Sequence, residues 1–334
     1  MILLTGASGF IGRHLAISLR QKHGKNGLFC FASDSPSCYE REGRQILLEN
    51  DIDYGEVDLL RPVSFFPILR QKSPLVILHL AAETSTCNSS FLCNDVGTRN
   101  LIDGLTQLGP SRHFVFTSSV AVLDGRRDTS IPIEDDRSRG KSPFSEYGRS
   151  KLRAENILKE ACRLIGFRLT ILRLVTVYGR IPKPESFLSV VKYHTLSNSL
   201  ASRLDWPGMT GLLHLEDLIN IIPNLIYDPP PPGEPETLIL QSESIKLATI
   251  FELAYKSARK KYRPIVLPKP VWRLLGFGLK SLLAGGLEMP GVLFQPLWRA
   301  NIMINNVFWS RSVLGDRGVT TAHHYFHNTI GDVF

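Results

Sequence analysis

Four short apolar runs that alternate with helix-patterned segments constrain the fold of this chain most strongly. They are GLFCFAS (27–33), SPLVILHLAA (73–82), RHFVFTSS (112–119) and RLTILRLVTVYG (168–179). Each run is apolar almost throughout rather than at every second residue, which is typical of parallel strands covered on both faces. We therefore predict an α/β fold with a doubly wound parallel sheet, in which ligands bind beyond the carboxyl ends of the strands.

Segments with helical periodicity separate these runs. Two of them are VGTRNLIDGLTQL (96–108) and SEYGRSKLRAENILKEACRLIG (145–166), and we expect the second to end at Gly166 as its C-cap. Beyond about residue 180 the alternation loosens. DPPPPGEPE (228–236) predicts a surface loop, and a short strand, TLILQS, and a helix, LATIFELAYKSARKKY, follow it. We infer a smaller C-terminal lobe folded against the sheet.

The composition limits the classes of partner. Of the 334 residues, 43% are hydrophobic and 21% charged, as in ordinary globular proteins. The net charge of +8 comes from scattered basic residues, and the densest run, KSARKKYR (256–263), reads as a solvated helix face, so we expect no nucleic-acid partner. The apolar segment VWRLLGFGLKSLLAGGL (271–287) is short and carries Arg273 and Lys280, so we expect no integral membrane segment.

Cysteine usage and the start of the chain bear on location. The chain has five cysteines, Cys30, Cys38, Cys87, Cys93 and Cys162. Their spacing shows neither a close pair nor a metal-ligand pattern, which favours reduced thiols. Because the first predicted strand begins at residue 1, we expect no signal peptide and a cytoplasmic protein.

The chain opens with MILLTGASGFIGRHL, in which an apolar strand over residues 1–4 runs into a glycine-rich turn and then into a helix. Gly6, Gly9 and Gly12 stand three residues apart in this turn. Glycine tolerates positive φ and admits close approach to the backbone, and the new helix offers unpaired N–H groups and the positive end of its dipole. A phosphate fits there, so we predict a Rossmann-type nucleotide site; a plain strand–helix turn is the alternative.

A second stretch, SEYGRSK, places Tyr147 and Lys151 one helical turn apart on one face. A lysine ammonium beside a phenol lowers the pKa of the phenol, which makes the tyrosine a candidate general acid or base. A third stretch ends a buried strand at Ser119, where a hydroxyl can hydrogen-bond a reacting oxygen. The alternatives are an exposed aromatic beside a solvated lysine, and a serine that only satisfies a turn.

Seven motifs in order, TGASGFIG, HLAA, NDVGTRNL, FVFTSS, YGRSK, LRLVTVYG and LLHLEDL, resemble the extended short-chain dehydrogenase/reductase superfamily. The resemblance covers about residues 1–220 and is to the branch of NAD(P)-dependent epimerases and dehydratases. It implies an enzyme with Tyr147 as acid/base, Lys151 as its tuner and a ribose contact, and Ser119 as the group that positions the substrate oxygen. It also implies a small-molecule substrate and a homodimer.

The resemblance assigns further contacts to cofactor and substrate. The implied cofactor contacts are Gly6, Gly9, Phe10, Ile11 and Gly12 at the pyrophosphate, Asp58 and Leu59 at the adenine, and Ala81, Ala82 and Asn94 in the nucleotide cleft. The implied substrate contacts are Thr84, Ser119, Thr176 and Arg180. We accordingly predict an NAD(P)-binding Rossmann domain over residues 1–180 and a smaller substrate-binding lobe over residues 181–334, part of which returns to the sheet.

The end of the second predicted strand bears on the cofactor. Asp34 lies 22 residues after Gly12, near the distance at which an acidic side chain binds the ribose 2′-hydroxyl, which favours NAD. Arg41 and Arg44 follow closely and keep NADP open, because either could meet a 2′-phosphate. The alternative for Asp34 is a turn aspartate.

Two departures from the family leave the substrate open. Thr176 and Thr210 stand where nucleotide-sugar members commonly have an asparagine and an arginine that hold the diphosphate, and Val120 and Ala121 replace the acidic pair of dehydratases. We expect a nucleotide-sugar epimerase or reductase first. A 3β-hydroxysteroid-type dehydrogenase or reductase of an apolar alcohol or ketone is the alternative, and a non-catalytic cofactor-binding scaffold is the third reading.

A histidine-rich segment, TAHHYFHN, lies near the end of the chain and contains His323, His324 and His327. It has no acidic or cysteine partner nearby in the sequence, so we expect a solvated terminal segment and no metal site.

Overall fold

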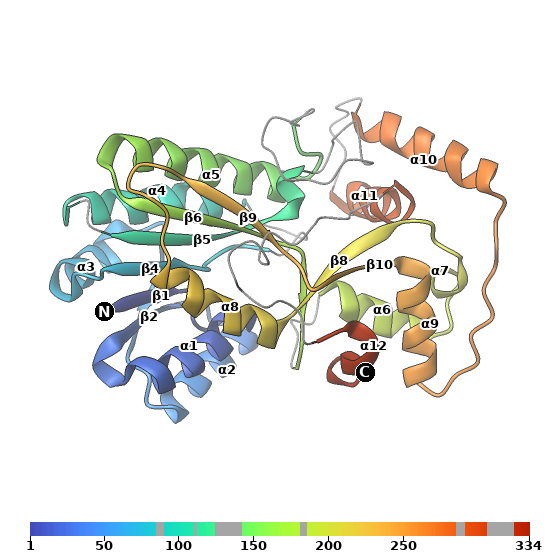
Figure 1. The fold of residues 1–334 in the computed structure, drawn as a ribbon. Coiled ribbons are helices and arrows are strands. Elements are labelled where there is room, and N and C mark those ends of the chain that lie inside the picture. The colour runs from blue at the N-terminus through green and yellow to red at the C-terminus, as the bar shows by residue number, and fades with distance from the viewer. Residues whose placement is uncertain (85–89, 110–111, 124–141, 181–185, 285–290, 306–323) are drawn as a thin grey trace.

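A computed structural model of the chain describes residues 1–84, 90–109, 112–123, 142–180, 186–284, 291–305 and 324–334. Within these residues the chain forms a larger lobe around a seven-stranded sheet and a smaller lobe around a three-stranded sheet (Figure 1). The large sheet contains β1 (Ile2–Thr5), β2 (Leu28–Ser33), β3 (Tyr54–Val57), β4 (Val76–His79), β5 (His113–Ser119), β6 (Arg168–Leu174) and β9 (Glu236–Leu240).

All pairings in the large sheet are parallel, and the strand order is β3-β2-β1-β4-β5-β6-β9. From β1 the chain proceeds outward through β2 and β3 and then crosses back to β4 on the other side of β1. The order therefore reverses between β1 and β4, and this switch point is where doubly wound sheets bind ligands. The predicted parallel α/β fold is confirmed.

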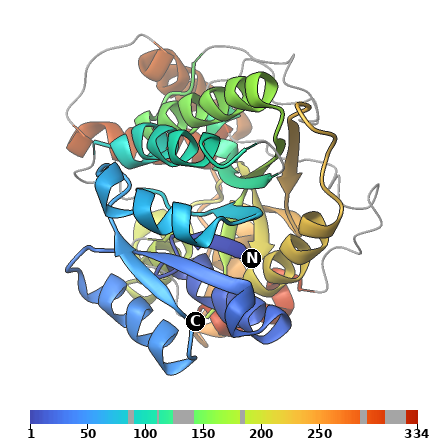
Figure 2. The ribbon, with the colours of Figure 1, turned by 90° about the vertical axis from the view of Figure 1, so that its left-hand side faces the viewer.

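Helices cover both faces of this sheet, as Figures 1 and 2 show. One face carries α1 (Phe10–His23), α2 (Cys38–Glu49) and α8 (Leu215–Tyr227), and the other carries α3 (Phe66–Lys72), α4 (Leu92–Thr106) and α5 (Glu146–Ile165). Leu15 of α1 and Leu218 of α8 belong to one buried cluster with the strands, and Leu101 of α4 and Leu158 of α5 belong to the other. Both faces of the sheet are therefore buried under helices, as the nearly continuous apolar runs predicted.

The small lobe contains β7 (Thr176–Tyr178), β8 (Met209–His214) and β10 (Glu243–Lys246), in the order β10-β8-β7. Around them lie α6 (Phe187–Leu196), α7 (Leu200–Arg203), α9 (Leu247–Ser257), α10 (Lys269–Ala284), α11 (Gly291–Asn305) and α12 (Phe326–Thr329) (Figure 1). A third buried cluster, which includes Tyr178, Trp206, Phe251 and Phe326, fills this lobe.

Four single turns of 3₁₀ helix complete the described elements: η1 (Lys25–Gly27), η2 (Pro62–Ser64), η3 (Val120–Leu123) and η6 (Ile330–Asp332). They join or extend the longer elements. η3 follows β5 directly, so it continues the chain from the carboxyl end of a central strand.

The chain passes between the lobes more than once. The apolar run 168–179 forms two strands, β6 in the large sheet and β7 in the small one, rather than a single strand. Later, α8 packs beside α1 and β9 pairs with β6, so two segments beyond residue 180 lie on the large sheet. A division at residue 180 therefore does not separate contiguous bodies, and the assignment of the two parts to cofactor and substrate stays a prediction.

Two local expectations meet different outcomes. Gly166 ends α5 with φ +83° and donates its N–H to the carbonyl of Cys162, so the expected C-cap is confirmed. The expected helix over residues 247–262 ends at Ser257, and a left-handed residue, Arg259 with φ +54°, follows. The basic run 256–263 is therefore mostly irregular chain rather than a helix face. No helix of the described residues is long and apolar enough to cross a membrane.

Candidate functional site

A cavity of about 900 Å³ opens at the carboxyl ends of the large sheet and extends under the small lobe. Its wall includes the glycine turn after β1, the end of β5, the start of α5, and residues of β7, β8, α6, α9 and α11. Both lobes therefore contribute to one space. A volume of this size lies at the upper end of the range of small-molecule and cofactor sites.

Each of the three glycines of the turn is glycine for a different physical reason. Gly6 has φ +71°, and a Cβ there would lie 2.6 Å from the backbone nitrogen of Ala81. A Cβ on Gly12 would lie 2.0 Å from the carbonyl oxygen of Gly6. Gly9 has φ −72°, and a Cβ there would meet only the Gly6 oxygen, at 3.2 Å. Gly6 and Gly12 are thus required by the turn itself, whereas the open side of Gly9 faces the cavity.

The helix that follows the turn begins without a side-chain cap. Gly9 is the N-cap of α1, and no side chain accepts from the first N–H groups. The exposed donors and the positive end of the helix dipole point to the wall formed by Gly9, Phe10 and Ile11. This arrangement suits an anionic group such as a pyrophosphate.

A buried hydrogen-bond chain fixes the turn against β4. Thr98 donates its hydroxyl proton to the carbonyl of Asn94, so its oxygen accepts from Nε2 of His79, 2.9 Å away. Nδ1 of His79 then accepts from the hydroxyl of Thr5, at 2.7 Å, and that hydroxyl accepts from the N–H of Ala81. Burial lowers the pKa of His79 to about 3, so the ring is neutral and the chain has one consistent set of donors.

Ser119, Tyr147 and Lys151 lie together at the end of β5 and the start of α5. The Ser119 hydroxyl accepts from the N–H of Ala121 and hydrogen-bonds the Tyr147 phenol, and both residues line the cavity. Lys151 lies just beneath the wall, where its ammonium donates to the carbonyl of Thr117 at 2.9 Å. The helix begins at Glu146 because the Ser145 side chain caps it by accepting from the N–H of Gly148.

The electrostatics of this group differ from the expectation. Burial raises the pKa of Tyr147 to about 12, and the hydrogen bond from Ser119 only partly offsets it. Burial also lowers the pKa of Lys151 to about 8, against the opposing effects of Cys93 and Glu155. The expected lowering of the tyrosine pKa by the lysine is therefore wrong for this state of the site. The phenol is protonated and can act as an acid, and acting as a base requires additional positive charge nearby.

A buried ion pair fastens the helix that carries Tyr147 to the strands below it. Glu155 of α5 is 0% exposed and accepts from the hydroxyl of Ser118 at 2.6 Å. Its two carboxylate oxygens also accept from Nε and Nη2 of Arg173 in β6, at 3.0 and 2.7 Å. Because Ser118 precedes Ser119, this network fixes the spacing between the two elements that carry Ser119 and Tyr147.

Asn94 acts as a clamp beneath the cavity rather than on its wall. Its amide oxygen accepts from the N–H of Glu83, and its amide nitrogen donates to the carbonyl of Glu83 and to the hydroxyl of Ser150. The clamp ties the loop after β4 to α5 and so positions Ala82 and Thr84, which line the cavity.

The structure divides the predicted contacts into two sets. On the wall lie Gly6, Gly9, Phe10, Ile11, Gly12, Ala82, Thr84, Ser119, Tyr147 and Thr176. Off the wall lie Asp34, Asp58, Leu59, Ala81, Asn94, Lys151 and Arg180. Asp34 is exposed beyond the end of β2, and Arg180, 80% exposed, pairs with Asp332 at 3.1 Å. The roles assigned to these residues remain predictions.

The sequence reasoning missed residues at the start of α2. Tyr39 and Glu40 line the cavity, and the guanidinium of Arg13 lies 4.3 Å from the centre of the Tyr39 ring. Three buried polar atoms here, Arg13 Nη1, Tyr39 Oη and Glu40 Oε2, have no hydrogen-bond partner among the described residues. The available signal was the capping box SCYE, in which Ser37 accepts from the N–H of Glu40.

Arg44, one of the two arginines that could have bound the 2′-phosphate of NADP, contacts other groups of the protein. Its guanidinium donates to the carbonyls of Ser33 and Ser35 and lies 3.6 Å from the carboxylate of Glu56. It therefore holds the turn after β2 in place and does not line the cavity.

On the small-lobe side, the wall contains two cations that the motifs did not indicate, Lys280 of α10 and Arg299 of α11. Thr210 of β8 lines the cavity as well. These helices follow loosely patterned sequence, so no local signal could assign Lys280 and Arg299 to a site.

The terminal histidines also differ from the expectation. His324 has two acidic neighbours in space: Asp217, 2.6 Å from its Nδ1, and Glu216, 3.1 Å from its Nε2. The expectation that no acidic partner stands near is wrong for this residue, because α8 brings those carboxylates from more than a hundred positions away. His323 lies outside the described residues.

Comparisons with known proteins give a consistent family. UDP-glucuronate 4-epimerase 4 of Arabidopsis thaliana is 29% identical over 196 residues, covering 55% of this chain and 43% of that protein. The dTDP-L-rhamnose 4-epimerase of Burkholderia thailandensis is 30% identical over 213 residues, covering 53% of this chain and 58% of that protein. The match therefore spans about half the length of these relatives.

The fold is similar to that of solved structures as well. The crystal structure of UDP-glucuronic acid 4-epimerase from Bacillus cereus, in complex with UDP-glucuronic acid and NAD, has a TM-score of 0.66 and 19% identity and covers 90% of this chain and 98% of its own. A family model described as the NAD dependent epimerase/dehydratase family matches residues 2–211, more than half of the chain. With the motifs, the doubly wound sheet and this match in agreement, the chain belongs to the NAD dependent epimerase/dehydratase family, within the extended short-chain dehydrogenase/reductase superfamily.

Proposed function

We propose that this chain is an NAD-dependent epimerase or dehydrogenase that acts on a hydroxyl group of a nucleotide sugar. One observation carries the proposal: a single cavity of about 900 Å³ has the glycine turn, the Ser119–Tyr147 pair and two cationic side chains, Lys280 and Arg299, on its wall. A dinucleotide, a reacting hydroxyl and the anionic diphosphate of a substrate therefore have separate partners within one space.

The wall fits a dinucleotide. The open side of Gly9 and the uncapped start of α1 suit the pyrophosphate. The unpartnered Tyr39 Oη and Glu40 Oε2 suit the hydroxyls of the adenosine portion. Glu40, rather than the exposed Asp34, is the carboxylate on the wall, and it favours a ribose 2′-hydroxyl over a 2′-phosphate. NAD would supply hydride acceptance at the carbon that bears the reacting hydroxyl.

The acid/base work falls to Tyr147. Its phenol and the Ser119 hydroxyl bond each other and both face the cavity, so a substrate oxygen can replace one partner of that bond. Lys151 lies one helical turn from Tyr147, with its ammonium on the carbonyl of Thr117, and its charge would favour the phenolate once the ammonium turns toward the phenol. The positive charge of a bound nicotinamide would act in the same direction. In reduction the protonated phenol donates its proton to the substrate carbonyl oxygen. In oxidation the phenolate, formed once nearby positive charge has lowered the pKa of Tyr147, accepts the proton of the substrate hydroxyl.

Arg299 is the residue that we assign to the substrate diphosphate. The family's usual arginine before LLHLEDL is Thr210 here, and Thr210 lines the same cavity as Arg299. A guanidinium on α11 compensates for that missing charge, because it forms bidentate bonds with phosphate oxygens. The matched relatives act on nucleotide sugars by name and give no support to the 3β-hydroxysteroid alternative. In this proposal, residues 1–180 bind the cofactor and residues 181–334 bind most of the substrate.

Isothermal titration tests the proposal. Wild-type protein is titrated with NAD and NADP and then, in the presence of NAD, with UDP-, GDP- and dTDP-sugars, alongside Arg299→Gln and its control Arg273→Gln, an exposed residue of α10 outside the wall. We expect saturable binding of NAD and of one nucleotide sugar, with sugar binding weakened about tenfold or more in Arg299→Gln alone. Binding of NAD without any response to nucleotide sugars would refute the proposed substrate class. If neither NAD nor NADP binds, the proposal that the chain is an NAD-dependent enzyme is refuted.

A further inference from the structure

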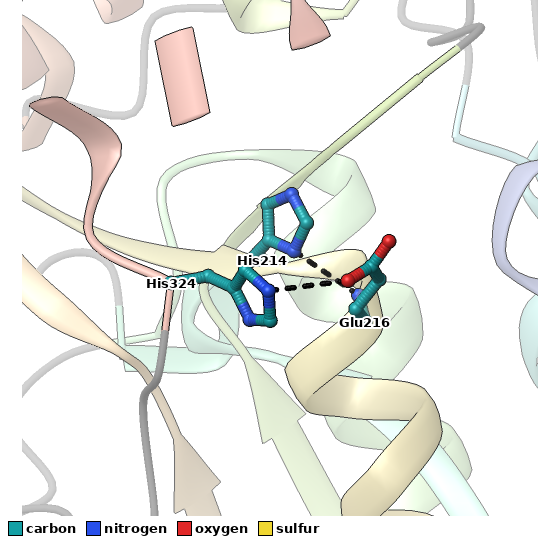
Figure 3. Close-up of side chains that lie close together, drawn as sticks. All are labelled: His214, Glu216 and His324. Atoms are coloured by element: carbon teal, nitrogen blue, oxygen red, sulfur yellow. Dashed lines mark hydrogen bonds and ion pairs between the residues drawn. The ribbon is translucent and has the colours of Figure 1, made fainter. Parts of the chain in front are cut away.

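A cluster of two imidazoles and a carboxylate lies outside the cavity, where the end of the chain meets the junction of β8 and α8. It consists of His214, the last residue of β8, Glu216 in the first turn of α8, and His324, which precedes α12. Figure 3 shows the side chains of His324 and Glu216 meeting beside the ring of His214. One ligand atom from each of the three lies within 4.8 Å of the others.

We propose that these three residues form a binding site for a divalent transition metal ion, with zinc as the best match. Two histidine nitrogens and one carboxylate oxygen are a ligand set that zinc accepts in four-coordinate sites that keep one position open. The proposal goes beyond the activity proposed above and does not depend on it.

The hydrogen bonds of the two rings present the correct nitrogens. Nδ1 of His214 accepts the N–H of Glu216 at 3.3 Å, so its lone pair points into the cluster and a metal would replace that hydrogen bond, and Nε2 lies 3.2 Å from the carboxylate of Asp332. Nδ1 of His324 lies 2.6 Å from the carboxylate of Asp217, and its Nε2 faces Glu216. Each ring thus has a carboxylate on its outer nitrogen, which orients the ring, as around known metal sites.

The charge of the surroundings also favours a cation. Three carboxylates, Glu216, Asp217 and Asp332, face the two rings, and within the described part of the chain Arg180 pairs with Asp332. A bound divalent ion would take the place of the proton that His324 shares with Glu216.

Coordination requires a small contraction. Bonds of about 2.0–2.2 Å in a tetrahedral site place ligand atoms about 3.3 Å apart. His214 is almost fully buried, with 3% of its side chain exposed, and serves as the fixed ligand. Glu216, 66% exposed, and His324, 27% exposed, have room to move toward it. The two imidazole rings are stacked with 4.5 Å between their centroids, and a tilt of the His324 ring would bring its ligand nitrogen closer to that of His214.

The ion would fasten the end of the chain to the wall of the cavity. The segment after His324 already packs there, because Tyr178 of β7 contacts the rings of His214 and Phe326 and bonds the hydroxyl of Thr329 at 2.9 Å. The same two strands, β7 and β8, carry Thr176 and Thr210 on the cavity wall. A metal at the cluster would therefore tie the segment after His324 to the two strands that carry Thr176 and Thr210.

Metal content and cobalt spectroscopy test the site. Untagged full-length protein is stripped with a chelator, dialysed against zinc and analysed for bound metal, and the same protein is titrated with Co²⁺. Matched variants are His324→Ala and Glu216→Gln. The controls are His327→Ala, an exposed histidine that stacks on Tyr325 outside the cluster, and Cys38→Ser, which removes an exposed thiol.

We expect one equivalent of zinc and the intense visible bands of tetrahedral Co²⁺ in the wild type and both controls. Affinity should fall at least about tenfold in His324→Ala and in Glu216→Gln, with circular dichroism unchanged. Zinc should also raise the Tm of the wild type and not that of His324→Ala. The proposed metal site would be refuted if the wild type retained no zinc, or if all variants retained the same amount of zinc as the wild type.

Discussion

We expect Gly9→Ala to weaken NAD binding at the glycine turn while leaving the protein folded. The new Cβ would lie 3.2 Å from the carbonyl oxygen of Gly6 and would meet no other atom of the protein within 4 Å. Gly9 also has an ordinary φ of −72° and forms no side-chain cap. Replacing a glycine N-cap by alanine costs about 1 kcal/mol, so the protein should stay folded, with Tm lowered by a few degrees.

The effect on NAD should be much larger than the effect on stability. The methyl group would stand on the cavity side of the turn, between a pyrophosphate and the first N–H groups of α1. Losing one charge-assisted hydrogen bond costs about 1.5–3 kcal/mol, which corresponds to roughly ten- to hundredfold weaker binding. Isothermal titration with NAD measures the affinity, and thermal unfolding measures the stability.

Gly12→Ala is the matched comparison. Its Cβ would lie 2.0 Å from the Gly6 carbonyl oxygen, inside the protein, so the main loss should be about 3 kcal/mol or more in the free energy of unfolding. NAD affinity in Gly9→Ala equal to that of the wild type, with the fold intact, would refute the assignment of the turn to the pyrophosphate.

Three further predictions concern the acid/base group and the buried network. Tyr147→Phe removes only the hydroxyl that bonds Ser119, so kcat should fall about 10²–10⁴-fold while NAD affinity stays unchanged. Steady-state kinetics measures the first quantity and isothermal titration the second, and a variant that retains its kcat would contradict the role of the phenol. Glu155→Gln removes the negative charge that faces the buried guanidinium of Arg173, 3% exposed, so urea unfolding should show a loss of about 3–5 kcal/mol. A loss below about 1 kcal/mol would contradict the contribution of the buried pair. His79 has its pKa lowered by burial to about 3 and stays neutral while the unfolded chain protonates below its ordinary pKa of 6.5, so the free energy of unfolding should fall by about 1.4 kcal/mol per pH unit as pH falls through that window. Urea titrations at pH 6 and pH 5, where carboxylates change little, check the slope, and a flat dependence would contradict it.

The fold followed from local pattern to a large extent. Near-continuous apolar strands required burial on both faces, and helical segments of the right length supplied the cover, so strands at 28–33, 113–119 and 168–174 lie where the runs predicted them. The break between β6 and β7 was not predicted. Both strands belong to one apolar run, and only their pairing with different partners separates them.

The candidate site divides in the same way. The glycine turn, Ser119 and Tyr147 were found because their motifs are contiguous and their backbone geometry is local. Glu40 and Arg299 were missed because each reaches the cavity through the placement of a whole helix. The pKa of Tyr147 was predicted in the wrong direction because helical spacing gives proximity to a lysine but not the degree of burial.

The sequence by itself determined the class of sheet, the position of the glycine turn and the placement of Tyr147 beside Ser119, since these depend on short contiguous motifs. The tertiary structure alone decided which side chains from distant segments share a space. It placed Arg299 on the cavity wall and brought His324 to Glu216. Such contacts arise when packing of the two lobes excludes water from apolar surface, and the residues that meet as a result carry no mark in the local sequence.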